Sequence, residues 1–346
     1  MSSFTVPIVD LSPYVQDGGT AARQQVAGTL AEACSSVGFM QVIGHGIPPA
    51  VIDGLTGAID SFFGLELEDK KAYVVKGANR GYTPPKSESL SLSLGVENPG
   101  MMNDFFEAYN VGIETRSFPD LELDESDYGL NVWPALEGWR EAIDTYFGEA
   151  QRVAHTLTAV FTEALGVPDG FFASITDHSI DVLRLNNYAL PDGTVSPTDD
   201  LVGMSEHTDY GIVTVLWADQ VAGLQVLDTA GVWHDVSPID DALLINLGDV
   251  TARLTNDAWM STLHRVMPPV INGTVKRRRS VAFFHDGNSD ALIETLPQFL
   301  DAAGGLAYAP ITVSEHVKAK LAGSRQGKIN TAAVREACRV RAAAGR

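Results

Sequence analysis

The sequence predicts a mainly β fold, a sandwich or barrel, backed by a helical N-terminal region. Apolar residues recur at helical spacing before residue 165, whereas short β-rich runs roughly ten residues apart follow residue 180. Helices with one apolar face cannot bury that face alone, so we expect them to pack on the β half. This predicts one domain over 1–346, with a mostly helical part (1–165), a β core carrying the functional site (180–313) and a helical tail (314–346).

The N-terminal part reads as helices around one strand. A helix is expected over 20–37, where the apolar positions are three or four residues apart, and Gly38 ends it before an apolar strand. The stretch 79–102 is rich in Gly, Pro and Ser, so we expect a long loop that serves as a lid or substrate loop, or is a simple surface excursion. The other elements expected here are a strand over 39–43, helices over 48–64 and 65–74, and the largest helix over 133–165.

The β core is predicted from apolar runs bounded by turn residues. Such spacing favours a sandwich or barrel over alternating strands and helices. A last helix is expected over 313–321. The predicted strands are 181–188, 212–218, 224–227, 232–236, 242–247, 263–267, 280–285 and 308–312.

Charge and cysteine content exclude several classes of function. Acidic residues outnumber basic ones 44 to 24, a net charge of −20 that repels nucleic acids and anionic membranes, so we expect neither as a partner. The chain has no signal-like start and no run approaching about 18 apolar residues, which predicts a cytoplasmic protein. With two cysteines, Cys34 and Cys338, any metal must be held by His and carboxylate groups.

The tripeptide His207-Thr208-Asp209 is the first candidate metal-binding motif. On an extended segment, residues two apart point to the same side, so the imidazole and the carboxylate can converge on one ion. A third ligand must come from another strand, and His264, His234 and His285 are the candidates in the β half. Two imidazoles and one carboxylate leave open positions that suit Fe(II), although zinc accepts the same ligands.

A second motif follows the third candidate ligand. Arg278 and Ser280 share one side of a predicted strand whose neighbours are apolar. A buried guanidinium needs an anion, and its planar fork matches a carboxylate. The competing interpretation is that residues 276–279, KRRR, form a solvated basic hairpin.

The order of these motifs resembles the isopenicillin N synthase-like family of Fe(II)- and 2-oxoglutarate-dependent oxygenases, along nearly the whole chain. The segments that carry the resemblance are VPIVDL (6–11), GF (38–39), GHGIP (44–48), RGY (80–82), DFFE (104–107), LRLNNY (183–188), HTD (207–209), GLQV (223–226), INLGD (245–249), STLHRV (261–266) and RRSVAFF (278–284).

The resemblance implies a double-stranded β-helix, or jelly roll, and assigns residues to roles. By similarity, His207, Asp209 and His264 would bind iron. The distal carboxylate of 2-oxoglutarate would bind Arg278 and Ser280. The other residues assigned by similarity are Tyr188 and Asn186 in the 2-oxoglutarate pocket, and Arg80, Tyr82 and Thr208 near the substrate, each of which could instead only anchor its loop.

The resemblance also implies a reaction. Family members use Fe(II), O2 and 2-oxoglutarate to oxidise, most often hydroxylate, an unactivated C–H bond of a small organic molecule, and release succinate and CO2. Their substrates include secondary metabolites. The alternatives are a 2-oxoglutarate-independent oxidase or cyclase of the isopenicillin N synthase type, a Zn(II) hydrolase on the same ligands, and a non-catalytic binding module. Oligomeric state and substrate identity are not predicted.

Overall fold

The computed structural model describes residues 4–94, 104–189, 203–271, 274–300 and 308–326, with positions 328, 330, 333 and 335. The predicted loop over 79–102 therefore lies partly outside the described residues, as does much of the predicted tail over 314–346. Among the described residues, no helix is both long and apolar enough to cross a membrane.

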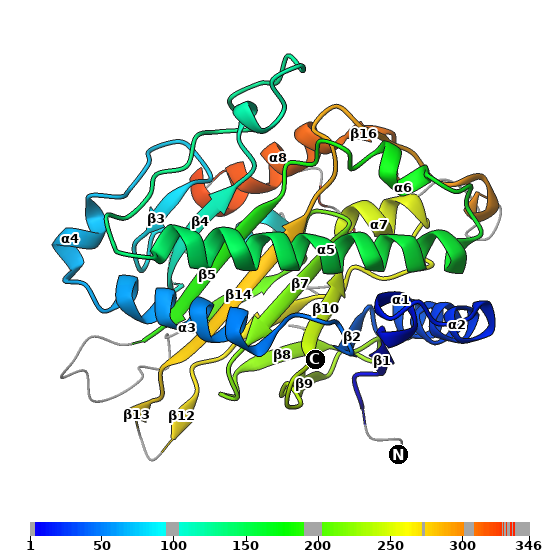
Figure 1. Cartoon of the computed structure of the whole chain (residues 1–346), viewed down its shortest axis with the longest axis horizontal. Coiled ribbons are helices and arrows are strands. Elements are labelled where there is room, and N and C mark those ends of the chain that lie inside the picture. Colours follow the sequence, from blue (N-terminus) through cyan, green and yellow to red (C-terminus); the bar gives the residue numbers. More distant parts are fainter. Residues whose placement is uncertain are drawn as a thin grey trace.

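Helices and short strands are interspersed up to residue 174, and strands predominate after it (Figure 1). The helices are α1 (Ser12–Val15), α2 (Thr20–Ser36), α3 (Pro49–Phe63), α4 (Leu67–Lys71), α5 (Trp139–Leu165), α6 (Phe171–Ser174), α7 (Asp249–Leu254) and α8 (Val313–Gln326), with 3-10 turns η1 (Leu90–Leu94), η2 (Thr115–Ser117) and η3 (Pro297–Phe299). The strands are β1 (Ile8–Asp10), β2 (Phe39–Ile43), β3 (Gly81–Thr83), β4 (Glu107–Gly112), β5 (Val182–Tyr188), β6 (Met204–His207), β7 (Val213–Ala218), β8 (Leu224–Leu227), β9 (Trp233–Asp235), β10 (Leu243–Leu247), β11 (His264–Val266), β12 (Val270–Ile271), β13 (Thr274–Val275), β14 (Arg278–His285), β15 (Leu292–Ile293) and β16 (Ile311–Thr312).

Two sheets form the jelly roll that the family resemblance implies. The larger sheet has the strand order β1-β2-β10-β7-β14-β5-β4-β3, and the smaller has the order β6-β11-β8-β9. An apolar cluster joins the two sheets: Phe39 and Tyr188 come from the larger sheet, and Val226 and Val266 come from the smaller one. The functional site lies in this space between the sheets.

Helix α5 covers the outer face of the larger sheet (Figure 1). It buries a stripe of residues spaced three or four apart, and it contacts α2, α3, β7 and β14. Gly166 ends the helix with a φ of 63°, a left-handed conformation that glycine adopts without the steric cost other residues carry. The predicted helix over 133–165 therefore begins later, at Trp139, and ends where expected.

The N-terminal part contributes more strands than the single one, over 39–43, that its sequence predicts. Strand β1 pairs with β2, and β2 pairs with β10, so they extend one end of the larger sheet. Strands β3 and β4 extend the other end through β5. Strands of three to six residues are too short to show a period, and their partners are distant in the chain.

The predicted loop and several boundaries also need correction. Residues 81–83 of the predicted loop form β3, and residues 90–94 form η1, so this segment is partly regular. The predicted strand over 308–312 shortens to β16, which pairs with β15 outside both main sheets. Strand β6 was not predicted as a strand, and the final helix continues to Gln326 instead of ending at residue 321.

Candidate metal and cosubstrate site

Three predicted metal ligands lie together at the end of the smaller sheet. His207 ends β6 and His264 begins β11, and the two residues are directly opposite in the antiparallel ladder. Asp209 follows two residues after His207, and its Oδ1 lies 3.8 Å from Nε2 of His207 and 3.7 Å from Nε2 of His264. One donor atom from each residue lies within 4.8 Å of the other two, and all three residues are buried.

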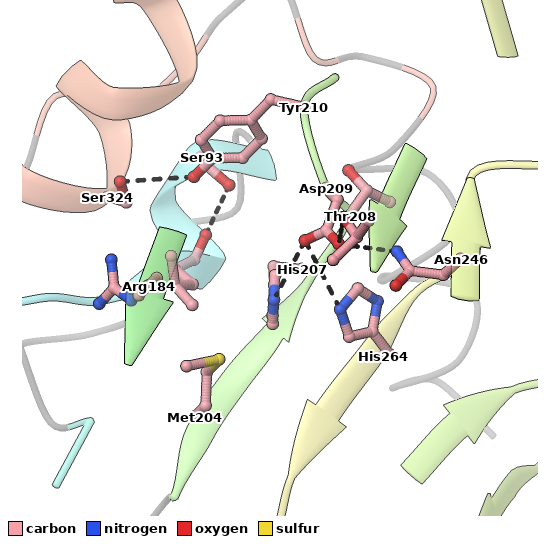
Figure 2. Close-up of polar contacts among 12 residues, drawn as sticks. Ser93, Arg184, Met204, His207, Thr208, Asp209, Tyr210, Asn246, His264 and Ser324 are labelled. Atoms are coloured by element: carbon pink, nitrogen blue, oxygen red, sulfur yellow. Dashed lines mark hydrogen bonds and ion pairs between the residues drawn. The ribbon is translucent and has the colours of Figure 1, made fainter. Parts of the chain in front are cut away.

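The hydrogen bonds around the ligands leave their donor atoms free to face one another (Figure 2). Nδ1 of His207 lies 2.8 Å from the Ser205 carbonyl, and Nδ1 of His264 lies 3.0 Å from the Thr262 carbonyl. A proton on each Nδ1 satisfies these contacts and leaves each Nε2 lone pair for a metal. Asp209 accepts hydrogen bonds on Oδ2 from the Asn246 amide, at 2.7 Å, and from the Thr214 hydroxyl, which leaves Oδ1 for the metal.

The electrostatics of the site favour a neutral imidazole at His207. Burial, together with the neighbouring His264, lowers the pKa of His207 to about 3. A neutral imidazole is the form that binds a metal. Two neutral imidazoles and one carboxylate on one side of a cavity fit a divalent ion such as Fe(II), with positions left open for other ligands. His234 and His285 lie elsewhere: His234 pairs with Asp228, and His285 pairs with the buried Asp181.

His207, Asp209 and His264 line a cavity between the two sheets, and the empty space there is about 960 Å³ when the open solvent at its mouth is included. All four predicted 2-oxoglutarate residues line the same cavity. Arg278 lies directly opposite Tyr188, and Ser280 lies opposite Asn186, in the β14–β5 ladder. Apolar side chains surround this end of the cavity; they are Phe39, Met204, Leu216, Leu224 and Val266.

Arg278 is a buried cation with unused hydrogen-bond donors. It is 1% exposed, and its Nε and Nη1 have no hydrogen-bond partner among the described residues. Its guanidinium carbon lies 5.2 Å from the centre of the Tyr188 ring, a cation–π distance that holds the head group in place. Burying such a group without a partner costs several kcal/mol, so the site is built for an anion.

The arginine side chains next to Arg278 point to the opposite side of the sheet from Arg278 itself. Arg277 and Arg279 point outward, and both pair with Asp60, at 2.8 Å and 2.9 Å. Arg278 lies between them and faces the cavity. The interpretation of this run as a solvated basic hairpin therefore holds for its outward residues and is wrong for Arg278, because successive residues of a strand face opposite sides.

The three predicted substrate residues do not line the cavity. Arg80 donates hydrogen bonds to three backbone carbonyls, those of Asn79, Ile113 and Gly129, at 2.8 to 3.1 Å. Tyr82 donates to Glu107, and Thr208 donates to Asp249 at 3.3 Å. These contacts correspond to the alternative in which each residue anchors its loop.

Several cavity residues were not identified from the sequence. Arg184 lies on β5 two residues before Asn186, so alternation along LRLNNY could have revealed it. Glu88 lies between Arg184, at 2.5 Å, and Arg325 of α8, at 2.8 Å. No local pattern indicates that a residue of the final helix reaches the cavity, so Arg325 could not have been found without the tertiary structure.

Comparison with known proteins agrees with this geometry. Residues 6–136 match the family model described as the non-haem dioxygenase in morphine synthesis N-terminal region, and residues 180–287 match the 2OG-Fe(II) oxygenase superfamily. The chain is 32% identical to the 2-oxoglutarate-Fe(II) type oxidoreductase hxnY of Emericella nidulans, over 92% of this chain and 90% of that protein. It is 30% identical to the clavatol oxidase claD of Penicillium crustosum, over 93% of this chain and 97% of that protein.

A solved structure shows the same architecture. A full-length Neurospora crassa protein, crystallised in complex with alpha-KG, which is 2-oxoglutarate, has a TM-score of 0.78 and 26% identity over 93% of this chain and 97% of that one. These similarities explain why the ligand set faces a cavity with a buried arginine, and they favour iron over zinc. The chain belongs to the 2OG-Fe(II) oxygenase superfamily and is a non-haem iron, 2-oxoglutarate-dependent dioxygenase.

Proposed function

We propose that the protein hydroxylates an unactivated C–H bond of a small organic molecule and converts 2-oxoglutarate to succinate and CO2. The observation that carries this proposal is the buried Arg278, whose Nε and Nη1 find no hydrogen-bond partner in the described part of the chain, in the cavity that His207, Asp209 and His264 line. A carboxylate is the anion that the guanidinium fork matches, and 2-oxoglutarate carries one at each end.

In this proposal each cavity residue has a distinct task. His207, Asp209 and His264 hold Fe(II), which when bound supplies the redox chemistry that activates O2. Arg278 and the Ser280 hydroxyl hold the distal carboxylate of 2-oxoglutarate. Tyr188 and Asn186 line the same pocket and shape it around the cosubstrate chain.

The surrounding residues orient the Asp209 carboxylate and exclude water from the 2-oxoglutarate end of the cavity. Asn246 and Thr214 hold one carboxylate oxygen of Asp209, so that the other oxygen keeps a fixed direction toward both imidazoles. Apolar side chains around the 2-oxoglutarate end limit the access of water, which protects reactive species from side reactions and strengthens the ionic contact to Arg278. The cytoplasmic location expected from the sequence stays a prediction.

The test is the visible absorption of the anaerobic protein with Fe(II) and 2-oxoglutarate. A weak charge-transfer band should form as the 2-oxo acid binds the metal. Arg278→Gln should weaken 2-oxoglutarate binding about tenfold or more, because a charged hydrogen bond to a carboxylate is lost. Arg277→Gln removes the same charge from the residue just before β14, whose side chain pairs with Asp60 outside the cavity, and should leave the affinity unchanged.

Three results would contradict the proposal. Absence of the band and of 2-oxoglutarate binding in a titration would refute the cosubstrate role. Substrate turnover without stoichiometric succinate would indicate an oxidase of the isopenicillin N synthase type. Full activity with zinc in the absence of O2 would indicate a hydrolase.

A further inference from the structure

The end of the cavity remote from Arg278 contains a second cationic centre. Arg184 of β5 and Arg325 of α8 both line the cavity, and both pair with the buried Glu88. Two guanidinium groups share one carboxylate, so this cluster carries one positive charge in excess. Glu88 is ionised, because Arg184 and Arg325 offset the effect of its burial and hold its pKa below the usual range.

One donor of this cluster is unused. Nε of Arg325 lies 2.8 Å from Glu88, and Nη1 donates to the Ala78 carbonyl at 3.1 Å. Nη2 is buried and has no hydrogen-bond partner among the described residues. Leaving a charged donor buried and unpaired is unfavourable, so this atom needs an acceptor supplied from the cavity.

The second centre is offset from Arg278 along the sheet, and Nε of Arg184 donates to Oδ1 of Asn186, which lies between the two arginine positions, at 3.1 Å. In the β14–β5 ladder Arg278 faces Tyr188, whereas Arg184 faces Ala282, four residues further along each strand. At about 3.3 Å per residue this separates the two positions by about 13 Å along the sheet. The positive charge of Arg184 acts on His207, and Figure 2 shows His207 between Arg184 and His264. The second centre therefore lies beside the metal ligands, on the side of His207.

The remaining lining near this centre is largely apolar. Helix α8 presents Val317, Leu321 and Arg325 on one face, at spacings of four residues, and η1 presents Leu90. Phe284 and Val182 face each other across the β14–β5 ladder at this end. Asp286 also lines the cavity, but burial and the nearby Asp181 raise its pKa, which favours its neutral form.

We propose that Arg325, supported by Arg184, binds a carboxylate of the oxidised substrate, which is thus a small organic acid with an apolar body. This rests on the proposed function, because it assigns the first carboxylate site, at Arg278, to 2-oxoglutarate. Both carboxylates of 2-oxoglutarate are then used, one at Arg278 and one at the metal. Since the described residues supply no acceptor for Nη2 of Arg325, the proposal assigns this acceptor to the other substrate.

The experiment measures how tightly small organic acids and their amides bind to the protein, which is first loaded anaerobically with Fe(II) and saturating 2-oxoglutarate. The probes are matched acids and primary amides: benzoate with benzamide, phenylacetate with phenylacetamide, and hexanoate with hexanamide. Calorimetry should show at least one acid binding about tenfold or more tightly than its amide, because only the acid makes a charged hydrogen bond. The 2-oxoglutarate absorption band should persist while the acid binds.

Substitutions then test whether Arg325 causes the preference for acids over amides. Arg325→Gln should reduce the acid-over-amide ratio by about tenfold or more and leave 2-oxoglutarate affinity unchanged. Lys318→Gln removes the same charge from the exposed face of the same helix and should leave the ratio unchanged. Thermal unfolding and the Fe(II)–2-oxoglutarate band check that each variant is folded and loaded.

The proposal is overturned if no acid binds better than its amide up to the solubility limit, or if the acids displace 2-oxoglutarate. It is also overturned if Arg325→Gln folds, loads 2-oxoglutarate and keeps the full acid preference. If Arg325→Gln does not fold, the wild-type comparison of acids with amides still decides. Loss of the 2-oxoglutarate band in the wild-type chain would instead refute the proposed function and is recognised before any acid is added.

Discussion

At the scale of single residues, the site depends on which atom of each side chain is already occupied. Nδ1 of His207 and Nδ1 of His264 are hydrogen-bonded to the carbonyls of Ser205 and Thr262. One oxygen of Asp209 accepts hydrogen bonds from Asn246 and Thr214. The atoms that remain face one another. Neighbouring hydrogen bonds thus prepare the proposed metal site, because they fix the tautomer of each histidine and the direction of the carboxylate.

The same burial makes the metal-free protein sensitive to acid. The pKa of His207 falls to about 3, against about 6.5 in an unfolded chain. Between these values the unfolded chain binds a proton that the native protein does not, so the free energy of unfolding decreases as the pH falls from about 6.5 toward about 3. The slope is at most about 1.4 kcal/mol per pH unit for one such group.

His207→Gln removes this contribution. Urea unfolding of the metal-free proteins at about pH 7 and about pH 5 should therefore show a loss of stability that is about 1–2 kcal/mol smaller in the variant than in the wild type. An equal loss in both proteins would show that His207 is protonated in the native state at about pH 5.

At the scale of elements, helix α8 stabilises the segment that carries the metal ligands. Lys320 is fully buried, and its ammonium group lies 2.7 Å from Asp249 and donates to the Thr208 hydroxyl at 3.0 Å. The backbone N–H of Asp249 donates to the Asp209 carbonyl at 2.9 Å. Burial would raise the pKa of Asp249, but Lys320 and His316 hold it well below the usual range. Thr208 thus contacts α8 from its position between two ligands.

Breaking this buried ion pair should be costly. Lys320→Met leaves the Asp249 carboxylate buried without its main countercharge, and the free energy of unfolding should fall by about 3–5 kcal/mol. Lys71→Met is the control, because Lys71 is a half-exposed lysine of α4 that pairs with the exposed Glu68 at 2.7 Å; it should cost no more than about 1 kcal/mol. Denaturant unfolding of both variants measures the difference, and equal losses would contradict a special role for Lys320.

At the scale of the whole molecule, the helical layer and the jelly roll share one apolar core. A single buried cluster includes Leu157 of α5 and Val215, Val281 and Phe283 of the larger sheet. The other face of that sheet lines the cavity. Packing of the helices is therefore connected to the site through the thickness of one sheet.

This connection predicts that a core change remote from the cavity lowers the stability of the site. Leu157→Ala should destabilise the protein by about 2–5 kcal/mol, because it leaves a cavity in a well-packed region. Helical circular dichroism and the Fe(II)–2-oxoglutarate band should be lost together on heating, at a lower temperature than in the wild type. A band that disappears well before the helical signal would show that the barrel and the helices unfold separately.

The sequence by itself determined the chemistry of the proposed site and the class of the fold. His207-Thr208-Asp209 and Arg278-x-Ser280 are local patterns, because alternation along a strand already decides which side chains share a face. The spacing of apolar residues in the long helices and in the regular strands of the β core is also a local pattern, so these elements could be predicted. Short strands such as β3 were missed, because three residues show no period and the pairing that defines them is with a distant segment.

Only the tertiary structure decided which distant groups meet. It sets His264, and not His234 or His285, opposite His207 through the ladder between β6 and β11, which supports His264 as the proposed third ligand. In the tertiary structure Arg80 and Tyr82 lie outside the cavity lining. Arg325 and Lys320 of the last helix contact segments more than a hundred residues earlier in the chain. Such contacts depend on the path of the whole chain, since packing and charge pairing act on neighbours in space and not in sequence.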